Sequence, residues 1–327
     1  MTEVQFSRGP AGTWSTPDWP LSGHEVIPSG LLKSLRKRKN LPAFSRLFVH
    51  VAAITSSGLL LWELHQTLWA LPLMAVFGCL IALLFAPLHE CAHGTAFRTR
   101  WLNDLVGRIT GFLVQRPFLY FRYRHTSHHT YTQHPQLDPD LVPLPKSRVH
   151  YVLDMSARGF WKMCVAYHWR GATGRFDSGD LFFMPLGELS RITREFRICV
   201  MGYALLIAAT LQLDPLAPLV LIVGPRIFGE VLLRFLRMSE HTATDNSPNL
   251  LRNTRTTLVN PLLHFFYWEM PYHAEHHIAP SVPFHALFKL HGVVRSKIHF
   301  VSNRGIVGAH ADILQAVARQ QQPIGDS

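Results

Sequence analysis

Four stretches of the chain are apolar enough to cross a membrane, and they are arranged as two pairs. Residues 67–88 carry no charged side chain, and a helix rising about 1.5 Å per residue would extend them over about 33 Å, enough to span a bilayer core. Residues 47–63 precede them closely and contain Trp62, a residue type enriched at membrane interfaces. A second pair, 198–213 and 216–236, is divided by Asp214 and Pro215. The pattern predicts two transmembrane helical hairpins with four spans.

The last predicted span contains three charged residues. Arg226, Glu230 and Arg234 recur every four residues and therefore lie on one face of a helix. Charged groups within a span face the protein interior or the headgroups. We expect an internal ion pair, with headgroup contact for Arg234 and a path for a substrate carboxylate as alternatives.

Basic residues predict the orientation of the spans. A cluster precedes the first span at positions 33, 36–39 and 46, whereas the two turns at 64–66 and 214–215 contain no Lys or Arg. The positive-inside rule places both termini and the long segments 87–197 and 237–327 in the cytoplasm. The first 30 residues contain no apolar run, so we expect no cleavable signal peptide and an insertion signal in the first hairpin.

The segments outside the spans mix apolar and charged residues at helical spacing. The sequence therefore predicts an all-α integral membrane protein whose cytoplasmic helices form a cap. We expect a polar N-terminal segment (1–45), one membrane domain (46–300) and a C-terminal tail (301–327), frayed over 315–327.

Composition supports a membrane protein rather than a nucleic-acid-binding one. Among 327 residues, 32 Lys+Arg against 21 Asp+Glu give a formal charge of +11, but charged residues are only 16% and hydrophobic residues 48%. The basic residues follow the predicted topology, and no RNA- or DNA-binding motif surrounds them, so we expect no nucleic-acid partner. Four widely spaced cysteines argue against a disulfide scaffold, a cysteine zinc site and a fused rubredoxin-like carrier.

Histidine is the unusual residue, with 20 copies that include three clusters. The clusters read HECAH, HTSHH and HAEHH, and on a helix residues three or four apart share a face, so each cluster can direct its rings at one point. All three lie in segments predicted to be cytoplasmic. Eight imidazoles exceed the four ligands of a zinc site, which favours two metal ions, and imidazole suits Zn, Cu, Fe and Ni. The location and the lack of an arranged hydrolytic base favour a redox-active ion.

The segments HECAH, RHTSHHTYTQHPQLDPD and MPYHAEHHIAPSVPFHALFKLH resemble the three histidine boxes of the integral-membrane fatty acid desaturase and hydroxylase superfamily. The similarity runs from about residue 89 to 291 and includes the hairpin between the second and third boxes. It implies a non-haem di-iron centre that uses O₂ to remove hydrogen from an acyl chain or another lipid-like substrate. A histidine in MSEHTATD is similar in position to an additional ligand of some members. The implied ligands are His89, His93, His125, His128, His129, His241, His273, His276 and His277.

One position departs from part of that superfamily. Arg237 lies four residues before His241, where some members of the acyl-CoA type have an amide, and this difference weakens the inference of that subgroup's substrate or metal geometry.

Other polar and aromatic residues near the boxes have two interpretations each. Carboxylates that accept hydrogen bonds from ligating imidazoles orient those rings, and the candidates are Asp138, Asp140, Glu240 and Glu275. For Asp138 and Asp140 the alternative is a structural turn at the sequence Asp-Pro-Asp. Four histidines near the boxes are expected either to contact the ligands without binding the metal or merely to lie nearby: His134, His264, His285 and His291. Four aromatics are expected to anchor the interface, with an acyl tunnel as the alternative: Phe118, Tyr120, Phe121 and Tyr123.

The resemblance favours a desaturase that introduces a C=C bond into an acyl lipid, with a hydroxylase or ketolase on the same centre as the alternative. Electrons are expected from a separate ferredoxin, rubredoxin or small haem cytochrome, and a basic cytoplasmic surface suits an acidic carrier.

Two other classes of protein are rivals. HECAH satisfies H-E-x-x-H, which would make Glu90 the general base of a membrane zinc protease, but that leaves the other clusters unexplained. A metal transporter would place its ligands near the bilayer midplane, whereas these clusters flank the spans.

Overall fold

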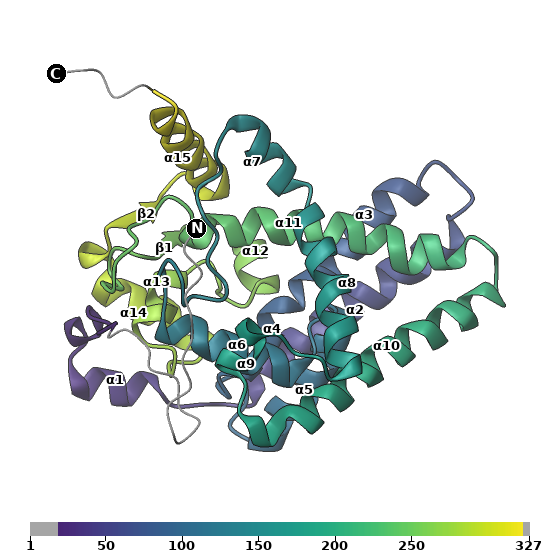
Figure 1. Ribbon diagram of the computed structural model, residues 1–327, viewed down its shortest axis with the longest axis horizontal. Helices are drawn as coiled ribbons and strands as arrows, with labels where there is room; N and C mark the ends of the chain where they lie inside the picture. Colours follow the sequence, from purple (N-terminus) through teal and green to yellow (C-terminus); the bar gives the residue numbers. More distant parts are fainter. Residues whose placement is uncertain (1–18, 323–327) are drawn as a thin grey trace.

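The computed structural model describes residues 19–322, and helices dominate that part of the chain, as the all-α prediction requires (Figure 1). Its elements in chain order are η1 His24–Val26, α1 Ser29–Leu35, α2 Leu41–Glu63, α3 Ala70–Leu83, α4 Phe85–Ala92, α5 Arg100–Leu113, α6 Phe118–Thr130, α7 Arg148–Met155, α8 Arg158–Thr173, α9 Ser178–Phe183, η2 Leu186–Glu188, α10 Leu189–Leu211, η3 Leu219–Val223, α11 Gly224–His241, β1 Arg255–Thr257, α12 Pro261–Phe266, α13 His273–Ile278, α14 Phe284–Val294, η4 Arg295–Lys297, β2 Phe300–Ser302 and α15 Gly305–Gln320. The two strands pair in parallel.

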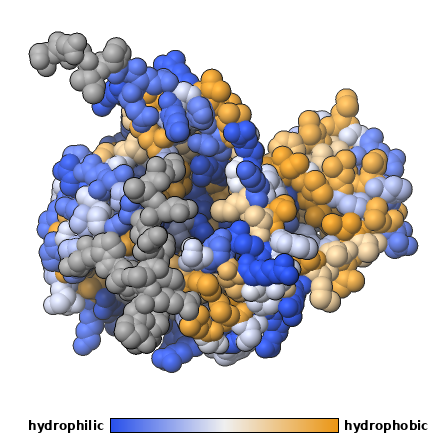
Figure 2. Space-filling view, viewed as in Figure 1, coloured by the Kyte–Doolittle hydropathy of each residue, from blue (hydrophilic) through white to orange (hydrophobic). Residues whose placement is uncertain are grey.

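Long helices project from one side of the molecule and carry an apolar surface. Two segments, Leu41–Glu63 and Ala70–Ala92, are long and apolar enough to cross a membrane. Figure 2 shows hydrophobic side chains gathered on the part of the molecule formed by α2, α3, α10 and α11 in Figure 1. Leu205 of α10 and Leu219 of η3 are among its exposed apolar residues. Such an exposed apolar surface fits a membrane-embedded region.

Helix α3 packs closely against α11. A Cβ atom added at Gly78 would lie 1.9 Å from the carbonyl oxygen of Pro225, and one added at Gly229 would lie 2.3 Å from the carbonyl oxygen of Gly78. Small residues at a helix crossing let the backbones touch, as they do in many membrane helix pairs. This contact fixes α11 against the span that leads into α4.

The largest buried cluster lies where the apolar helices meet the rest of the molecule. It includes Leu88 of α4, Phe118 of α6, Leu236 of α11 and Trp268. These elements come from distant parts of the chain, and three of them also carry histidines of the predicted boxes. The core therefore holds the box-bearing helices in fixed positions.

The C-terminal region differs from the predicted frayed tail. Helix α15 runs to Gln320, and its Ile313 and Val317 are fully buried. On the same helix, His310 Nε2 lies 2.8 Å from the carbonyl oxygen of Phe235 in α11. The prediction is wrong over 315–320, because apolar residues four apart give this helix a face that packs on α11. Residues 323–327 lie outside the described part of the chain.

Candidate metal centre

Four elements supply the histidines predicted as ligands. Helix α4 carries His89 and ends at Ala92, directly before His93, and α6 follows Pro117 and carries the second box. His241 is the last residue of α11, and the short helix α13 holds the third box. The box spacing therefore works as expected, since rings three or four positions apart share a helical face.

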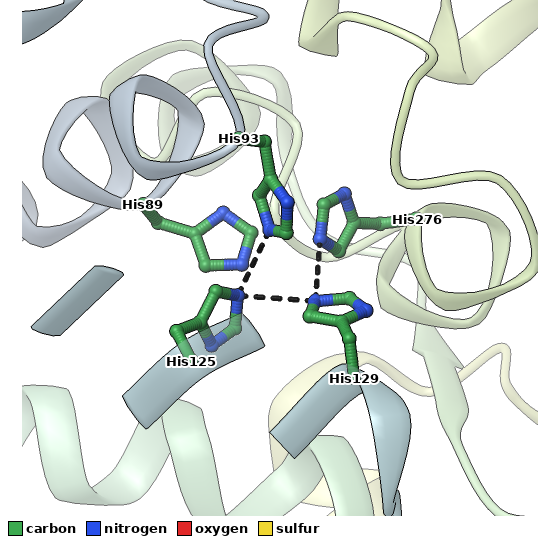
Figure 3. A group of neighbouring side chains, drawn as sticks. All are labelled: His89, His93, His125, His129 and His276. Carbon is green, nitrogen blue, oxygen red and sulfur yellow. Dashed lines mark hydrogen bonds between the residues drawn. The ribbon is translucent and has the colours of Figure 1, made fainter. Parts of the chain in front are cut away.

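The structure brings all nine rings together in two groups. The first contains His89, His93, His125, His129 and His276, and its members point toward a common centre in Figure 3. The second group contains His128, His241, His273 and His277. In each group one nitrogen from every ring lies within 4.8 Å of the others.

Several ring nitrogens are close enough to one another to share one metal ion. In the first group, Nε2 of His125 lies 3.0 Å from Nε2 of both His93 and His129, and Nε2 of His276 lies 3.2 Å from that of His129. In the second, the Nε2 atoms of His241 and His273 are 3.0 Å apart. Two nitrogens at about 2.1 Å from one ion lie about 3.0 Å apart at right angles and about 3.4 Å apart at the tetrahedral angle.

Outward-facing nitrogens of the second group contact fixed polar atoms. His128 Nδ1 lies 2.7 Å from Asp138 Oδ1, and His241 Nδ1 lies 3.1 Å from the carbonyl oxygen of Asn253. His277 Nδ1 lies 3.2 Å from Thr132 Oγ1. A proton held on Nδ1 by these acceptors leaves the Nε2 lone pair free to bind a metal.

Burial favours neutral imidazole rings at the site. It lowers the pKa of His125 to about 4, and burial together with repulsion from His128 lowers the pKa of His241 to about 3. Burial and the neighbouring rings also hold the pKa of His129 and His277 well below the usual value. Neutral imidazole is the metal-binding form, so the environment prepares these rings for ligation.

The carboxylate of Asp138 makes His128 the exception in this respect. Burial lowers the pKa of His128, but the adjacent Asp138 overcomes that effect and raises it above the usual value. The same carboxylate accepts hydrogen bonds from the backbone N–H groups of Gln133 and Asp140, at 2.9 Å each. Asp138 therefore has the orienting position that the sequence analysis predicted for it.

The other three predicted carboxylates differ in their contacts. Asp140 Oδ2 lies 4.0 Å from His125 Nδ1, and its Oδ1 accepts a hydrogen bond from Arg124. Glu240 Oε2 lies 3.6 Å from His273 Nε2, on the side of that ring that faces the group, and Tyr267 donates to its Oε1.

For Glu275, the prediction of an orienting contact with a ligand histidine is wrong. Its carboxylate contacts His291 Nδ1 and accepts a hydrogen bond from Thr256, because α13 turns that side chain toward α14 and β1.

Glu90 lies on the outer side of the first group. Its Oε1 is 3.9 Å from His89 Nδ1 and 4.0 Å from Nδ1 of His276, whose Nε2 faces the centre. Its Oε2 accepts hydrogen bonds from Thr95 Oγ1 and from the backbone N–H of Phe284. A general base acting on metal-bound water would face the centre, so this geometry opposes the zinc protease interpretation.

Histidines near the boxes have contacts of their own outside the two groups. His134 packs edge-on against Trp19, its Nδ1 accepts backbone hydrogen bonds, and His264 pairs with Glu269. His291 contacts Glu275, and His285 belongs to neither group. None of the four belongs to either histidine group of the described residues.

The predicted interfacial anchors are mostly inside the protein. Phe118, Tyr120 and Phe121 are buried, because α6 is covered by neighbouring helices, whereas Tyr123 is partly buried. The ring of Phe121 stacks on His125 at a centroid distance of 5.3 Å. The prediction of interfacial anchoring is therefore wrong for the three buried rings.

The charged stripe of α11 forms the predicted internal ion pair, with a partner that the sequence did not reveal. Arg226 Nη2 donates to Glu230 Oε1 at 2.7 Å. Arg116, from the loop before α6, donates two further hydrogen bonds of 3.1 Å to the same carboxylate. No local spacing links Arg116 to α11, so only the tertiary fold identifies this contact.

Comparison with known proteins agrees with the geometry of the site. A family model described as fatty acid desaturase matches residues 66–303, more than half of the chain. The chain is 25% identical over 258 residues to an acyl-lipid omega-3 desaturase (cytochrome b5) of the endoplasmic reticulum from Arabidopsis thaliana, which covers 72% of this chain and 64% of that protein.

Two further relatives have similar descriptions. An sn-1 oleoyl-lipid 12-desaturase from Picosynechococcus is 31% identical over 117 residues, covering 35% of this chain and 32% of the relative. A fatty acid conjugase from Calendula officinalis is 25% identical over 226 residues, covering 61% of this chain and 60% of the relative. In all three comparisons the match spans less than two thirds of the relative. The family match and the two histidine groups together show that this chain belongs to the fatty acid desaturase family.

Proposed function

We propose that this chain is a membrane desaturase that uses O₂ and a di-iron centre to introduce a C=C bond into an acyl lipid. The observation that carries the proposal is the convergence of nine imidazoles, seven buried and two (His93 and His129) partly buried, into two groups whose facing nitrogens lie within 4.8 Å of one another. The family assignment supplies the reaction class.

The residues of the two groups fit two iron ions. Five rings would hold one ion and four the other, and the nine ligands would be His89, His93, His125, His128, His129, His241, His273, His276 and His277. Five rings in one group exceed the four ligands of a tetrahedral zinc site, and imidazole suits iron as well as zinc. When bound, the irons would supply the O₂-activating redox chemistry. The chain's own residues favour the neutral form of the rings other than His128, orient three of them through Asp138, Asn253 and Thr132, and bury or partly bury all nine.

The proposed topology has four spans, with both termini and the histidine groups on the cytoplasmic side of the membrane. The exposed apolar residues of α10, η3 and α11 support two spans beyond the two long apolar segments. The basic residues before the first span support the orientation. We place the membrane domain at 46–300.

The substrate and the electron donor are proposed from the relatives. Their names describe acyl-lipid or oleoyl-lipid desaturases, and the Arabidopsis name includes cytochrome b5. We assign an acyl lipid to this chain as its substrate and a separate carrier as its donor, of the small haem cytochrome, ferredoxin or rubredoxin type.

The function is tested with His128→Ala and a matched control. Cells that lack or express the protein are compared by mass spectrometry of their lipids, and iron is measured in the purified protein. The wild type should add a double bond to an acyl chain, and His128→Ala should abolish the product and lower bound iron. His150→Ala removes an exposed ring on α7 and should change neither. An alcohol product would replace the desaturase proposal with a hydroxylase, and full activity of His128→Ala would contradict the ligand assignment.

A further inference from the structure

A cavity of about 210 Å³ with many charged side chains in its lining lies beside the histidine groups, with walls from α6, α7, α8 and α11 and from the loops before and after α6. Its charged lining residues are Arg116, Arg124, Asp140, Asp154, Glu230, Arg234 and Arg237. An adjoining hollow shares Arg116, Arg124, Asp140 and Arg237 and extends to Phe121, the residue whose ring stacks on His125. The cavity wall is therefore one contact away from a predicted metal ligand.

Each of two carboxylates in this region is shared by two guanidinium groups. Glu230 accepts hydrogen bonds from Arg116 and Arg226. Asp140 accepts one from Arg124 Nε at 2.8 Å, and its other oxygen lies 3.6 Å from Arg237 Nη2, beyond normal hydrogen-bond distance. Each arrangement leaves one positive charge in excess.

Two arginines keep unused hydrogen-bonding capacity. Arg237 Nε is buried and has no hydrogen-bond partner among the described residues. Arg234 lines the same cavity opposite Asp154 and forms no hydrogen bond or ion pair with another described residue. The cavity lining thus has four arginines against the three carboxylates Asp140, Asp154 and Glu230, and Arg226, outside the lining, also pairs with Glu230, so positive charge is in excess.

The charged cavity lies next to ligands of both groups. Arg124 directly precedes His125 in α6, and Arg237 is one helical turn, about 5.4 Å, before His241 in α11. Asp140 Oδ2 lies 4.0 Å from His125 Nδ1. A molecule held by these arginines would therefore have its anionic end close to both groups.

The guanidinium fork matches the oxygens of carboxylate and phosphate groups, and charge-assisted hydrogen bonds in a partly buried cavity are strong. We propose that this cavity binds the anionic group, carboxylate or phosphate, of the acyl substrate and directs the attached chain toward the histidine groups. Arg234 and Arg237 supply the donors that the protein leaves unpaired. This assignment rests on the proposed desaturase function and narrows its substrates to acyl molecules with a nearby negative charge.

The test measures binding and does not require turnover. Purified iron-loaded protein in detergent is incubated with radiolabelled palmitate, and bound label is read by scintillation proximity. Four competitors are compared. Unlabelled palmitate tests an acyl carboxylate and phosphatidate an acyl phosphate, whereas hexadecanol tests an uncharged chain and inorganic phosphate a free anion. The variants are Arg234→Gln and Arg237→Gln. Arg304→Gln is the control, since it changes an exposed arginine paired with Asp312 on α15.

Palmitate or phosphatidate should displace the label, and hexadecanol should not. Each cavity variant should weaken binding about tenfold or more with unchanged iron content, whereas Arg304→Gln should bind like the wild type. Whichever acyl anion competes at the lower concentration identifies the source of the charge.

Equal displacement by hexadecanol, unchanged affinity in both cavity variants, or an equal loss in Arg304→Gln would overturn the proposal. If inorganic phosphate displaced the label as effectively as phosphatidate, the claim that the cavity recognises an acyl molecule would be overturned. If only the anion-binding proposal is wrong, cells still form the unsaturated product. If the desaturase function is wrong, the product is absent while the protein still binds palmitate.

Discussion

Asp138 should control how tightly the second histidine group holds its metal. Asp138→Asn keeps the size of the side chain but removes the charge that faces His128 Nδ1 at 2.7 Å. A hydrogen bond to a charged group contributes about 1.5–3 kcal/mol, and each 1.4 kcal/mol is a factor of ten, so the metal affinity of the group should fall roughly 10- to 100-fold.

Competition with a chelator measures that loss. Iron-loaded protein is titrated with an iron chelator, and the metal retained is determined by mass spectrometry. Asp138→Asn should release about half of its iron at a chelator concentration at least tenfold lower than the wild type. Asp312→Asn, which changes an exposed carboxylate on α15, should titrate like the wild type. Identical curves for Asp138→Asn and the wild type would refute the orienting role of this carboxylate.

Three further predictions concern protonation, Glu90 and helix packing. The metal-free protein should lose stability as the pH falls from about 6.5 toward 4, because histidine in the unfolded chain binds a proton near pH 6.5 whereas folded His125 binds one only near pH 4. Each such ring should lower the free energy of unfolding by about 1.4 kcal/mol per pH unit in this range, and a flat profile of thermal stability against pH would contradict the burial of the rings. Glu90→Gln should keep both irons and part of the activity, since this carboxylate lies on the outer side of the rings; complete loss of turnover with intact iron would restore the hydrolase interpretation. Gly78→Ala should lower the melting temperature in detergent by several degrees, because the added Cβ would overlap the carbonyl group of Pro225. Gly30→Ala adds a Cβ in open space and should leave the melting temperature unchanged, and equal melting temperatures for the two variants would show that α3 and α11 can separate at little cost.

Local sequence patterns predict the helices and the histidines of the site. The uncharged stretch at 67–88 predicts a long apolar helix, and the structure has α3 and α4 there. The i, i+3 and i, i+4 spacing within each box predicts that its rings point together. Both inferences use periodicity within one segment, which needs no knowledge of the tertiary fold.

The division of the rings into two groups could not be predicted in the same way. His128 and His129 are adjacent in α6 but belong to different groups, and His276 joins His89 rather than its neighbour His277. The division depends on the angles at which α4, α6, α11 and α13 meet. The carbonyl of Asn253 that faces His241, and the contact of Arg116 with Glu230, depend on the same packing.

The metal content of the purified protein tests the central claim most directly. Protein from cells grown with iron and zinc is analysed for both metals by mass spectrometry, with the protein quantified by amino-acid analysis. We predict two iron atoms per chain, one for each histidine group. A single zinc ion per chain, with no iron, would contradict the account.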